Sequence, residues 1–171
     1  MKGIGSKRSP DRRIDLLLSI LDEAYERKAW QGPNLRGSLR GVSAREAAWR
    51  PARGRHNIWE LVLHAAYWKY ATRRMLTGER RGSFSEKGSN WFGRPDSGDE
   101  TAWRRDLARL SAEHRRLRRA IAALRPASLD RRPRGSKYRA ATLAYGVAAH
   151  DVYHTGQIQT LKVLQRRHRG R

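Results

Sequence analysis

Apolar residues recur every three or four positions in four long segments of the chain, and stretches rich in Gly, Pro and Arg separate these segments. This spacing places the apolar side chains on one face of an α-helix. The predicted helices cover about residues 10–30, 57–77, 99–125 and 139–166. No segment shows the alternation typical of a half-buried β-strand. The pattern therefore predicts an all-α protein whose long helices form a four-helix bundle.

Residues that satisfy or interrupt backbone hydrogen bonds mark the ends of these helices. Ser9 and Pro10 resemble an N-cap and first-turn pair for the first helix, while Asn57 and Asp99 are the predicted N-caps of the second and third. Three signals are predicted to end a helix: Gly32-Pro33, Gly78 and Pro126. Helix ends can thus be placed for most of the predicted bundle.

Two of the connecting stretches contain further signals: one predicts a short helix, and the other carries two adjacent aromatic residues. The run from Ser43 to Glu46 has the form of a capping box, which predicts one or two helical turns ending before Pro51. Trp91 and Phe92 stand together in a loop that is otherwise full of Gly and Ser. We expect these two rings to pack onto the bundle or, alternatively, to line the rim of a pocket.

The length and composition indicate one soluble domain. The chain has 171 residues, and we expect a core over about 10–165 between frayed basic termini. It contains no cysteine, which excludes disulfides and thiolate ligands and fits a reducing cytoplasm. No apolar run is long enough to span a bilayer and the N-terminus lacks the pattern of a signal peptide, so a cytoplasmic location without membrane contact is expected.

The charge is strongly positive. There are 38 Lys and Arg against 16 Asp and Glu, a formal net charge of +22, and 31 of the 38 are arginine. Such a balance favours anionic partners such as nucleic acid, anionic lipid or a carboxylate substrate. The basic residues are scattered along the chain, however, and no DNA-reading motif accompanies them, which favours a generally basic surface over a nucleic-acid site.

Two histidines four residues apart, His150 and His154, are the clearest candidates for chemistry. On a helix this spacing directs both rings from one face, so both can reach a single ion. The face also carries Val147 and Ile158, which places the rings inside the bundle. A divalent metal would satisfy both imidazoles; the alternative is a pair of core histidines bonded to backbone or hydroxyl groups.

A third ligand has to come from another helix, and His64 is the best candidate because its neighbours Leu61, Ala65 and Trp68 are apolar. The other histidines fit less well. His56 is too far along the helix from His64 for one ion and belongs at the start of that helix. We expect His114, among arginines, to lie on the surface, and His168, in the basic tail, to be solvated.

The segments NIWELVLHAAYWKYATRRMLTG and HDVYHTGQIQTLK, in this order, resemble the DinB/YfiT-like family, as do Trp49-Arg-Pro51 and Ile58 to Leu61. The resemblance covers about residues 10–165. It implies a four-helix bundle with a metal on three histidines, one from the second helix and two from an HxxxH pair on the last. These positions fall on His64, His150 and His154.

The resemblance also implies a function. The family includes thiol-dependent S-transferases and a thiol-dependent isomerase, in which the metal activates the thiol of a low-molecular-weight cofactor. We therefore expect a metal-dependent S-transferase acting on a small-molecule substrate; the alternatives are a metal-dependent hydrolase, or a non-catalytic metal-bound module whose basic surface binds nucleic acid. Zinc or nickel is the expected metal, with iron or manganese also accepted by three histidines, and a homodimer is expected.

Several residues near the histidines are candidates for supporting roles. Glu60, one helical turn before His64, is predicted to orient that ring or to act as a catalytic base. Gln157 is predicted to hydrogen-bond behind His154, and Tyr67, Tyr153 and Trp68 are candidates for the pocket wall. The alternative for each of these residues is a purely structural role, which is the more common one in such positions.

Overall fold

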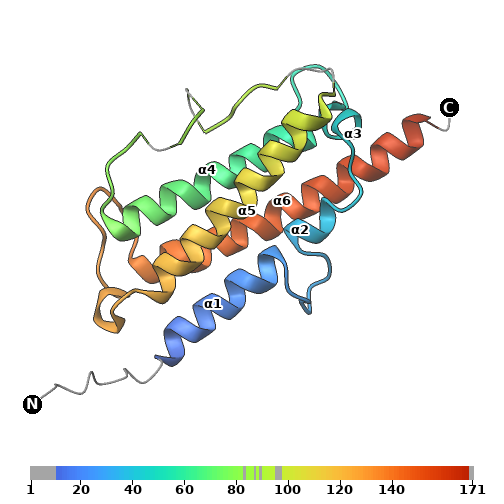
Figure 1. The fold of residues 1–171 in the computed structure, drawn as a ribbon. Coiled ribbons are helices and arrows are strands. Elements are labelled where there is room, and N and C mark those ends of the chain that lie inside the picture. The colour runs from blue at the N-terminus through green and yellow to red at the C-terminus, as the bar shows by residue number, and fades with distance from the viewer. Residues whose placement is uncertain (1–10, 83, 87, 89, 95–97, 170–171) are drawn as a thin grey trace, which may run out of the picture.

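The computed structural model describes residues 11–82, 84–86, 88, 90–94 and 98–169, and within these ranges every regular element is helical (Figure 1). The elements in chain order are α1 (Arg12–Tyr25), α2 (Leu35–Ser38), α3 (Ala44–Ala48), α4 (Ile58–Thr77), α5 (Glu100–Ala122), a 3₁₀ turn (Pro126–Ser128) and α6 (Ala140–Arg169). The prediction of an all-α protein is confirmed.

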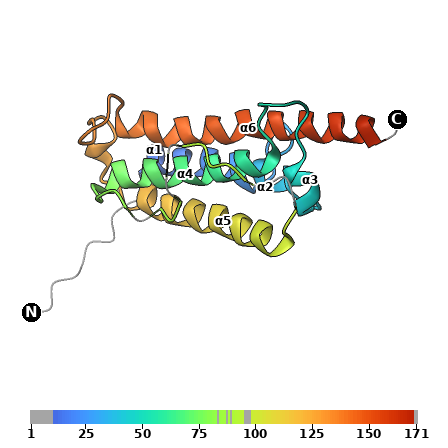
Figure 2. The ribbon, with the colours of Figure 1, turned by 90° about the horizontal axis from the view of Figure 1, so that it is seen from above.

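The four long helices α1, α4, α5 and α6 form a bundle. Helix α4 packs against α5 and α6, and α1 packs against the same two helices from the other side. Viewed from above, α6 runs the full length of the bundle and continues past it at its C-terminal end (Figure 2). The short helices α2 and α3 lie near that end. The predicted four-helix bundle is therefore confirmed.

Most of the predicted helix ends are found where the sequence placed them. The Asn57 side chain accepts a hydrogen bond from the backbone N–H of Glu60 at 2.8 Å, and Asp99 caps α5 in the same way. Gly78 closes α4 with a positive φ of 76°, a conformation that glycine adopts without steric cost. Ser43 and Glu46 form the complete capping box that opens α3.

The first helix is shorter than predicted. It ends at Tyr25, well before Gly32-Pro33, because the following residues Glu-Arg-Lys offer no apolar face to bury. The Asn34 side chain instead donates to the Arg27 carbonyl at 2.7 Å and then caps α2, an element the apolar pattern did not predict. The N-cap of α1 is Asp11. The predicted pair Ser9 and Pro10 lies outside the described residues.

Helix α6 is longer than predicted, reaching Arg169, because neither Gly nor Pro occurs between 157 and 169 to stop it. At the end of α5, the helix closes at Ala122, and Pro126 begins the 3₁₀ turn. None of the helices in the described ranges combines the length and the apolar character needed to cross a bilayer.

Helix α4 is buried on nearly all sides, which decides where the polar groups of this protein lie. Helices α5 and α6 cover two of its faces, and the segment after it returns over a third, burying Phe92 to 5% exposure. Its buried residues accordingly include several polar ones: Glu60, His64, Lys69, Thr72 and Arg73. A buried polar side chain needs a hydrogen-bonding or ionic partner, so α4 is the helix on which a functional site is expected.

Candidate metal centre

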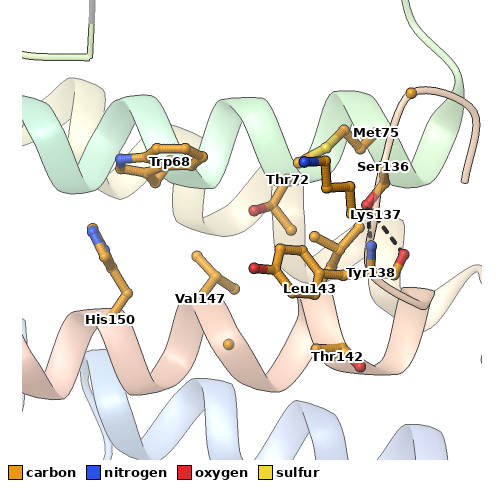
Figure 3. Close-up of a pocket in the computed structure, with 12 residues that line it drawn as sticks. Trp68, Thr72, Met75, Ser136, Lys137, Tyr138, Thr142, Leu143, Val147 and His150 are labelled. Carbon is orange, nitrogen blue, oxygen red and sulfur yellow. Dashed lines mark hydrogen bonds between the residues drawn. The ribbon is translucent and has the colours of Figure 1, made fainter. Parts of the chain in front are cut away.

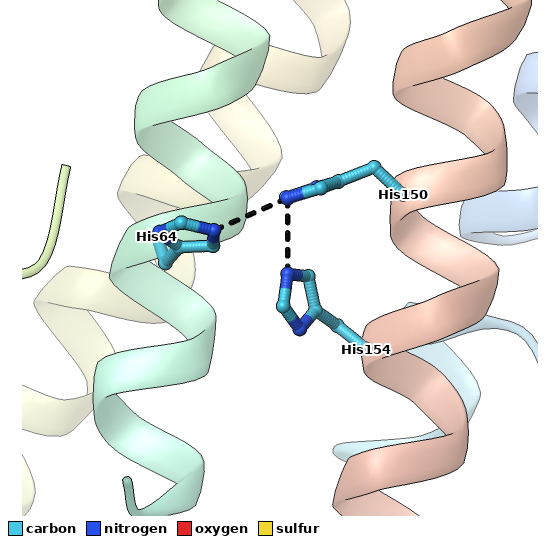
Figure 4. Close-up of side chains that lie close together, drawn as sticks. All are labelled: His64, His150 and His154. Atoms are coloured by element: carbon cyan, nitrogen blue, oxygen red, sulfur yellow. Dashed lines mark hydrogen bonds between the residues drawn. The ribbon is translucent and has the colours of Figure 1, made fainter.

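Three histidines from two helices meet inside the bundle (Figure 4). His64 comes from α4, and His150 and His154 come from successive turns of α6. The Nε2 atom of His150 lies 3.2 Å from that of His64 and 3.0 Å from that of His154. His64 is 5% exposed and His154 is 3% exposed. In the described part of the chain, this is the one group of three side chains close enough together to hold a metal ion.

Hydrogen bonds behind two of the rings fix their orientation. The Nδ1 atom of His64 lies 2.8 Å from the backbone carbonyl of Asn90, and Nδ1 of His154 lies 2.6 Å from the Gln157 Oε1 atom. Both partners are acceptors, so in each ring Nδ1 carries the hydrogen and donates it. The Nε2 atoms are then left with free lone pairs that point toward His150.

The resulting arrangement fits one metal ion better than it fits three histidines alone. Two lone pairs converge on His150 Nε2, and a single N–H there cannot give both of them a well-aligned hydrogen bond. One ion would satisfy all three nitrogens at once. Tetrahedral zinc with bonds of about 2.0–2.1 Å separates its nitrogen ligands by about 3.3–3.4 Å, close to the separations found here. The donor set thus suits a divalent metal.

The rings are held in the neutral state that metal binding needs. Burial lowers the pKa of His64 to about 4 despite the Asn90 carbonyl, which raises it. Burial, followed by the proximity of the other two rings and of Lys69, lowers the pKa of His150 to about 3. The pKa of His154 is also lowered, mainly by burial. At neutral pH all three imidazoles therefore present lone pairs.

Trp91 covers the outer side of the centre. Its ring stacks on His64 at 3.8 Å between centroids and on His56 at 3.7 Å, so it is sandwiched between the two imidazoles. Both alternatives expected for the Trp91-Phe92 pair occur: Phe92 packs in the core of the bundle, and Trp91 lines a cavity. His56 precedes the α4 N-cap and stays outside the three-histidine group, as predicted.

Glu60 is placed differently from its predicted role beside His64. Its carboxylate pairs with Arg50 at 2.7 Å and with His56 Nδ1 at 2.9 Å. Burial raises its pKa, but the hydrogen bonds from Arg50 and His56 outweigh this and hold the pKa below its usual value. The acceptor that orients His64 is the Asn90 carbonyl, a backbone group that no side-chain pattern could reveal. The role of Glu60 as a catalytic base stays a prediction.

The other candidates divide between the centre and its surroundings. Gln157 bonds to His154 as predicted, and it donates to the Tyr153 hydroxyl at 3.2 Å. Tyr153 is 64% exposed and its ring lies edge-on to His154. Trp68 lies edge-on to both His64 and His150. The ring contacts of Tyr67 are with other aromatic residues, Trp68, Tyr70, Phe84 and Phe92, so it supports the wall only indirectly.

The expectation that His114 lies on the surface is wrong. It is 1% exposed and stacks on Tyr25 at 3.8 Å, and neither ring nitrogen has a hydrogen-bond partner in the described part of the chain. The signal was available: His114 follows Leu110 by four residues and precedes Leu117 by three, which places it on the inward face of α5. His168 is exposed, as predicted.

Comparison with known proteins agrees with this geometry. A family model described as the DinB superfamily matches residues 29–158, which is more than half of the chain and includes all three histidines. No curated protein and no solved structure matches the chain.

Proposed function

The chain belongs to the DinB superfamily, and we propose that it is a metal-dependent S-transferase whose ion is held by His64, His150 and His154. The observation that supports the proposal is the convergence of three neutral Nε2 atoms, two of them with lone pairs fixed by hydrogen bonds on the far side of the ring. Three protein ligands leave positions open on a divalent ion, as in catalytic rather than structural sites.

A bound divalent ion would supply charge that lowers the pKa of a thiol or water toward neutrality. Because the chain has no cysteine, the sulfur nucleophile of such a transferase must come from an external low-molecular-weight thiol. In the transfer, the thiolate sulfur forms a bond to an electrophilic carbon, the leaving group departs with the electrons of the broken bond, and the thiol proton passes to solvent. The Asn90 carbonyl and Gln157 hold the imidazoles in place, and Trp91 shields His64 from water.

Zinc and nickel are the proposed metals, because imidazole suits both, while iron and manganese are the next choices. Protein purified without a nickel column should contain about one divalent ion per chain by elemental analysis. His154→Ala should lose that ion and His168→Ala, which removes an exposed histidine far along the same helix, should keep it. A content far below one ion that added zinc does not restore would refute the metal site.

The transfer itself is tested by supplying the metal-loaded protein with a panel of small thiols and an electrophile such as 1-chloro-2,4-dinitrobenzene. We expect chloride release that requires both a thiol and His154. If the protein binds its metal but transfers no thiol in the panel, the S-transferase proposal fails, and ester hydrolysis by the same preparation would favour the hydrolase instead.

A further inference from the structure

Two cavities flank the three-histidine centre, one on each side. The first, here called the apolar cavity, measures about 530 Å³, lies between α4 and α6, and has His150 in its wall (Figure 3). The second, here called the polar cavity, measures about 890 Å³ and has His154 and Trp91 in its wall. Both volumes fall in the range of about 300–1,000 Å³ typical of small-molecule sites. Each cavity thus reaches the centre through a different histidine.

The walls of the apolar cavity are hydrophobic except at one end. Trp68, Met75 and Val147 line it, and no acidic residue does. The one cationic residue among those that line it is Lys137, which lies at the opposite end of the cavity from His150 (Figure 3). The Lys137 side chain is exposed, so its ammonium group is accessible to an anionic ligand. The cavity therefore matches an elongated apolar ligand with an anionic group at one end.

The polar cavity has a different character. Its wall is also partly apolar, with Leu61, Trp91 and Leu161, but it has more polar groups than the apolar cavity. Arg55, Gln157, Thr160 and the Tyr153 side chain give a ligand there a cation, an amide and two hydroxyl groups. Such a lining suits a small molecule that carries several hydrogen-bonding groups along with some apolar surface. A low-molecular-weight thiol of the kind required by the proposed function has these groups, whereas an apolar electrophile does not.

A glycine inside α6 faces each cavity: Gly146 lines the apolar cavity and Gly156 lines the polar one. Glycine in a helix interior costs about 0.5–1 kcal/mol relative to alanine. Neither glycine has a positive φ, and an added Cβ would meet nothing within 4 Å at either position. Backbone conformation and close packing therefore do not require glycine here. What both glycines provide is space beside the histidines.

We propose that Gly146 and Gly156 keep open two separate substrate subsites, and that the two substrates are divided between them by polarity. The apolar cavity binds the electrophile, an amphiphilic organic acid whose anionic group lies on Lys137 and whose apolar body reaches toward His150. The polar cavity binds the thiol. This inference rests on the proposed function, because a division into two subsites presupposes a reaction with two substrates.

The apolar subsite can be tested by binding alone, without any reaction. The probes are 8-anilinonaphthalene-1-sulfonate and its neutral relative N-phenyl-1-naphthylamine, whose fluorescence rises in apolar surroundings. We expect both to bind the full-length protein. Gly146→Leu, which fills the cavity from the helix, should weaken both by about tenfold or more, equivalent to about 1.4 kcal/mol. Gly156→Leu is the matched control on the other side of the centre and should change neither by more than about twofold.

The anionic end group is tested separately at Lys137. Lys137→Gln should weaken the sulfonate probe by about three- to tenfold and leave the neutral probe unchanged. Lys28→Gln removes the same charge from an exposed position outside both cavities, and it should affect neither probe. Circular dichroism establishes that each variant is folded. If both probes bind folded Gly146→Leu as they bind the wild type, the proposed apolar subsite is wrong. If Lys137→Gln weakens both probes equally, the proposed contact between Lys137 and the anionic group is wrong.

The division of substrates is tested in the transfer assay, where its failure is distinct from failure of the proposed function. Gly156→Leu should raise the KM for the thiol and Gly146→Leu the KM for the electrophile, each by about fivefold or more. Transfer in which both variants raise both KM values equally overturns the division while the S-transferase proposal stands. Absence of transfer by the metal-loaded wild type overturns the proposed function, whatever the probes show.

Discussion

Two of the three histidines of the centre, His64 and His154, are held by a hydrogen bond from behind the ring, so residues that are not metal ligands are expected to control metal binding. Gln157 accepts from His154 Nδ1, and removing this acceptor frees the ring to rotate and to change its tautomer. Residues in this position typically contribute 10–100-fold to metal affinity.

Gln157→Leu is therefore expected to weaken zinc binding by about 10–100-fold in a competition titration with a chromogenic chelator. Gln157→Glu keeps an acceptor at the same place and should retain most of the affinity. Equal losses in both variants would show that the side chain supports the fold of α6 rather than the orientation of His154.

His114 is a second buried histidine position at which a single residue is expected to affect stability. Neither of its ring nitrogens has a hydrogen-bond partner among the residues that the structure describes, although the ring stacks on Tyr25. Leaving a buried polar group unpaired costs about 1–3 kcal/mol. His114→Phe keeps the stacking and removes the polar atoms, so we expect it to raise the free energy of unfolding at pH 7 by about 1 kcal/mol, measured by urea denaturation. A lower stability would mean that the space beside Tyr25 cannot hold the larger ring.

At the scale of helices, a buried ion pair joins the two elements that carry the histidines. Lys69 on α4 and Asp151 on α6 are both fully buried and bonded to each other, and the Lys69 ammonium lies 5.0 Å from the Tyr25 ring centroid. Removing one partner of a buried pair leaves a charge that is not compensated, at a cost of about 3–5 kcal/mol.

Lys69→Met should accordingly lower the free energy of unfolding by about 3–5 kcal/mol in a denaturant titration. Lys69→Met combined with Asp151→Leu should recover much of the loss, because no buried charge remains. If the double variant is the less stable of the two, the pair is worth more than apolar packing of the same volume.

The glycines of α6 predict a gain in stability. Since an added Cβ at Gly146 meets no atom within 4 Å, Gly146→Ala should gain helix propensity without a clash. We expect a free-energy gain of about 0.5–1 kcal/mol, which corresponds to a rise of about 1–4 °C in Tm for a domain of this size. The reverse change at the exposed neighbour Ala149, Ala149→Gly, is the control and should lower Tm by a similar amount.

The elements that the sequence predicted well are those with one apolar face and a clear cap. Asn57, Asp99 and Gly78 mark ends of α4 and α5 that depend on local hydrogen bonds alone. Helix α2 and the end of α1 depend on a side chain reaching back seven residues from Asn34 to Arg27, which periodicity does not report. The same holds at the centre: helical spacing brought His150 and His154 together, whereas the Asn90 carbonyl and the stacking of Trp91 arise from a returning loop.

For the whole molecule, the buried histidines predict acid sensitivity. Burial lowers the pKa of His114 to about 3, with Lys69 and nearby arginines adding to the effect, and similar burial holds His64 near 4 and His150 near 3. Unfolding returns each group to its ordinary pKa of about 6.5. Between these values the unfolded state binds more protons than the folded state, so stability rises with pH there and is lost as pH falls.

The metal-free protein is therefore expected to lose stability between about pH 6.5 and 4, with each histidine contributing up to about 1.4 kcal/mol per pH unit. Urea titrations at pH 7, 6 and 5 would measure this slope, and His114→Phe, which removes one of four buried histidines, should reduce it by about one quarter. A slope unaffected by that variant would mean that His114 already takes up its proton in the folded protein.

The two helices that hold the three histidines are separated along the chain by the whole of α5 and two long connections. An ion bound there would tie α4 to α6 as a removable cross-link that closes a large loop of the chain, doing for a protein without cysteine what a disulfide does elsewhere. Ligands that bind only the folded state stabilise it by about 4 kcal/mol at a thousand times their dissociation constant. The concentration of free metal would then determine the stability of the folded protein as well as the rate of the reaction that it catalyses.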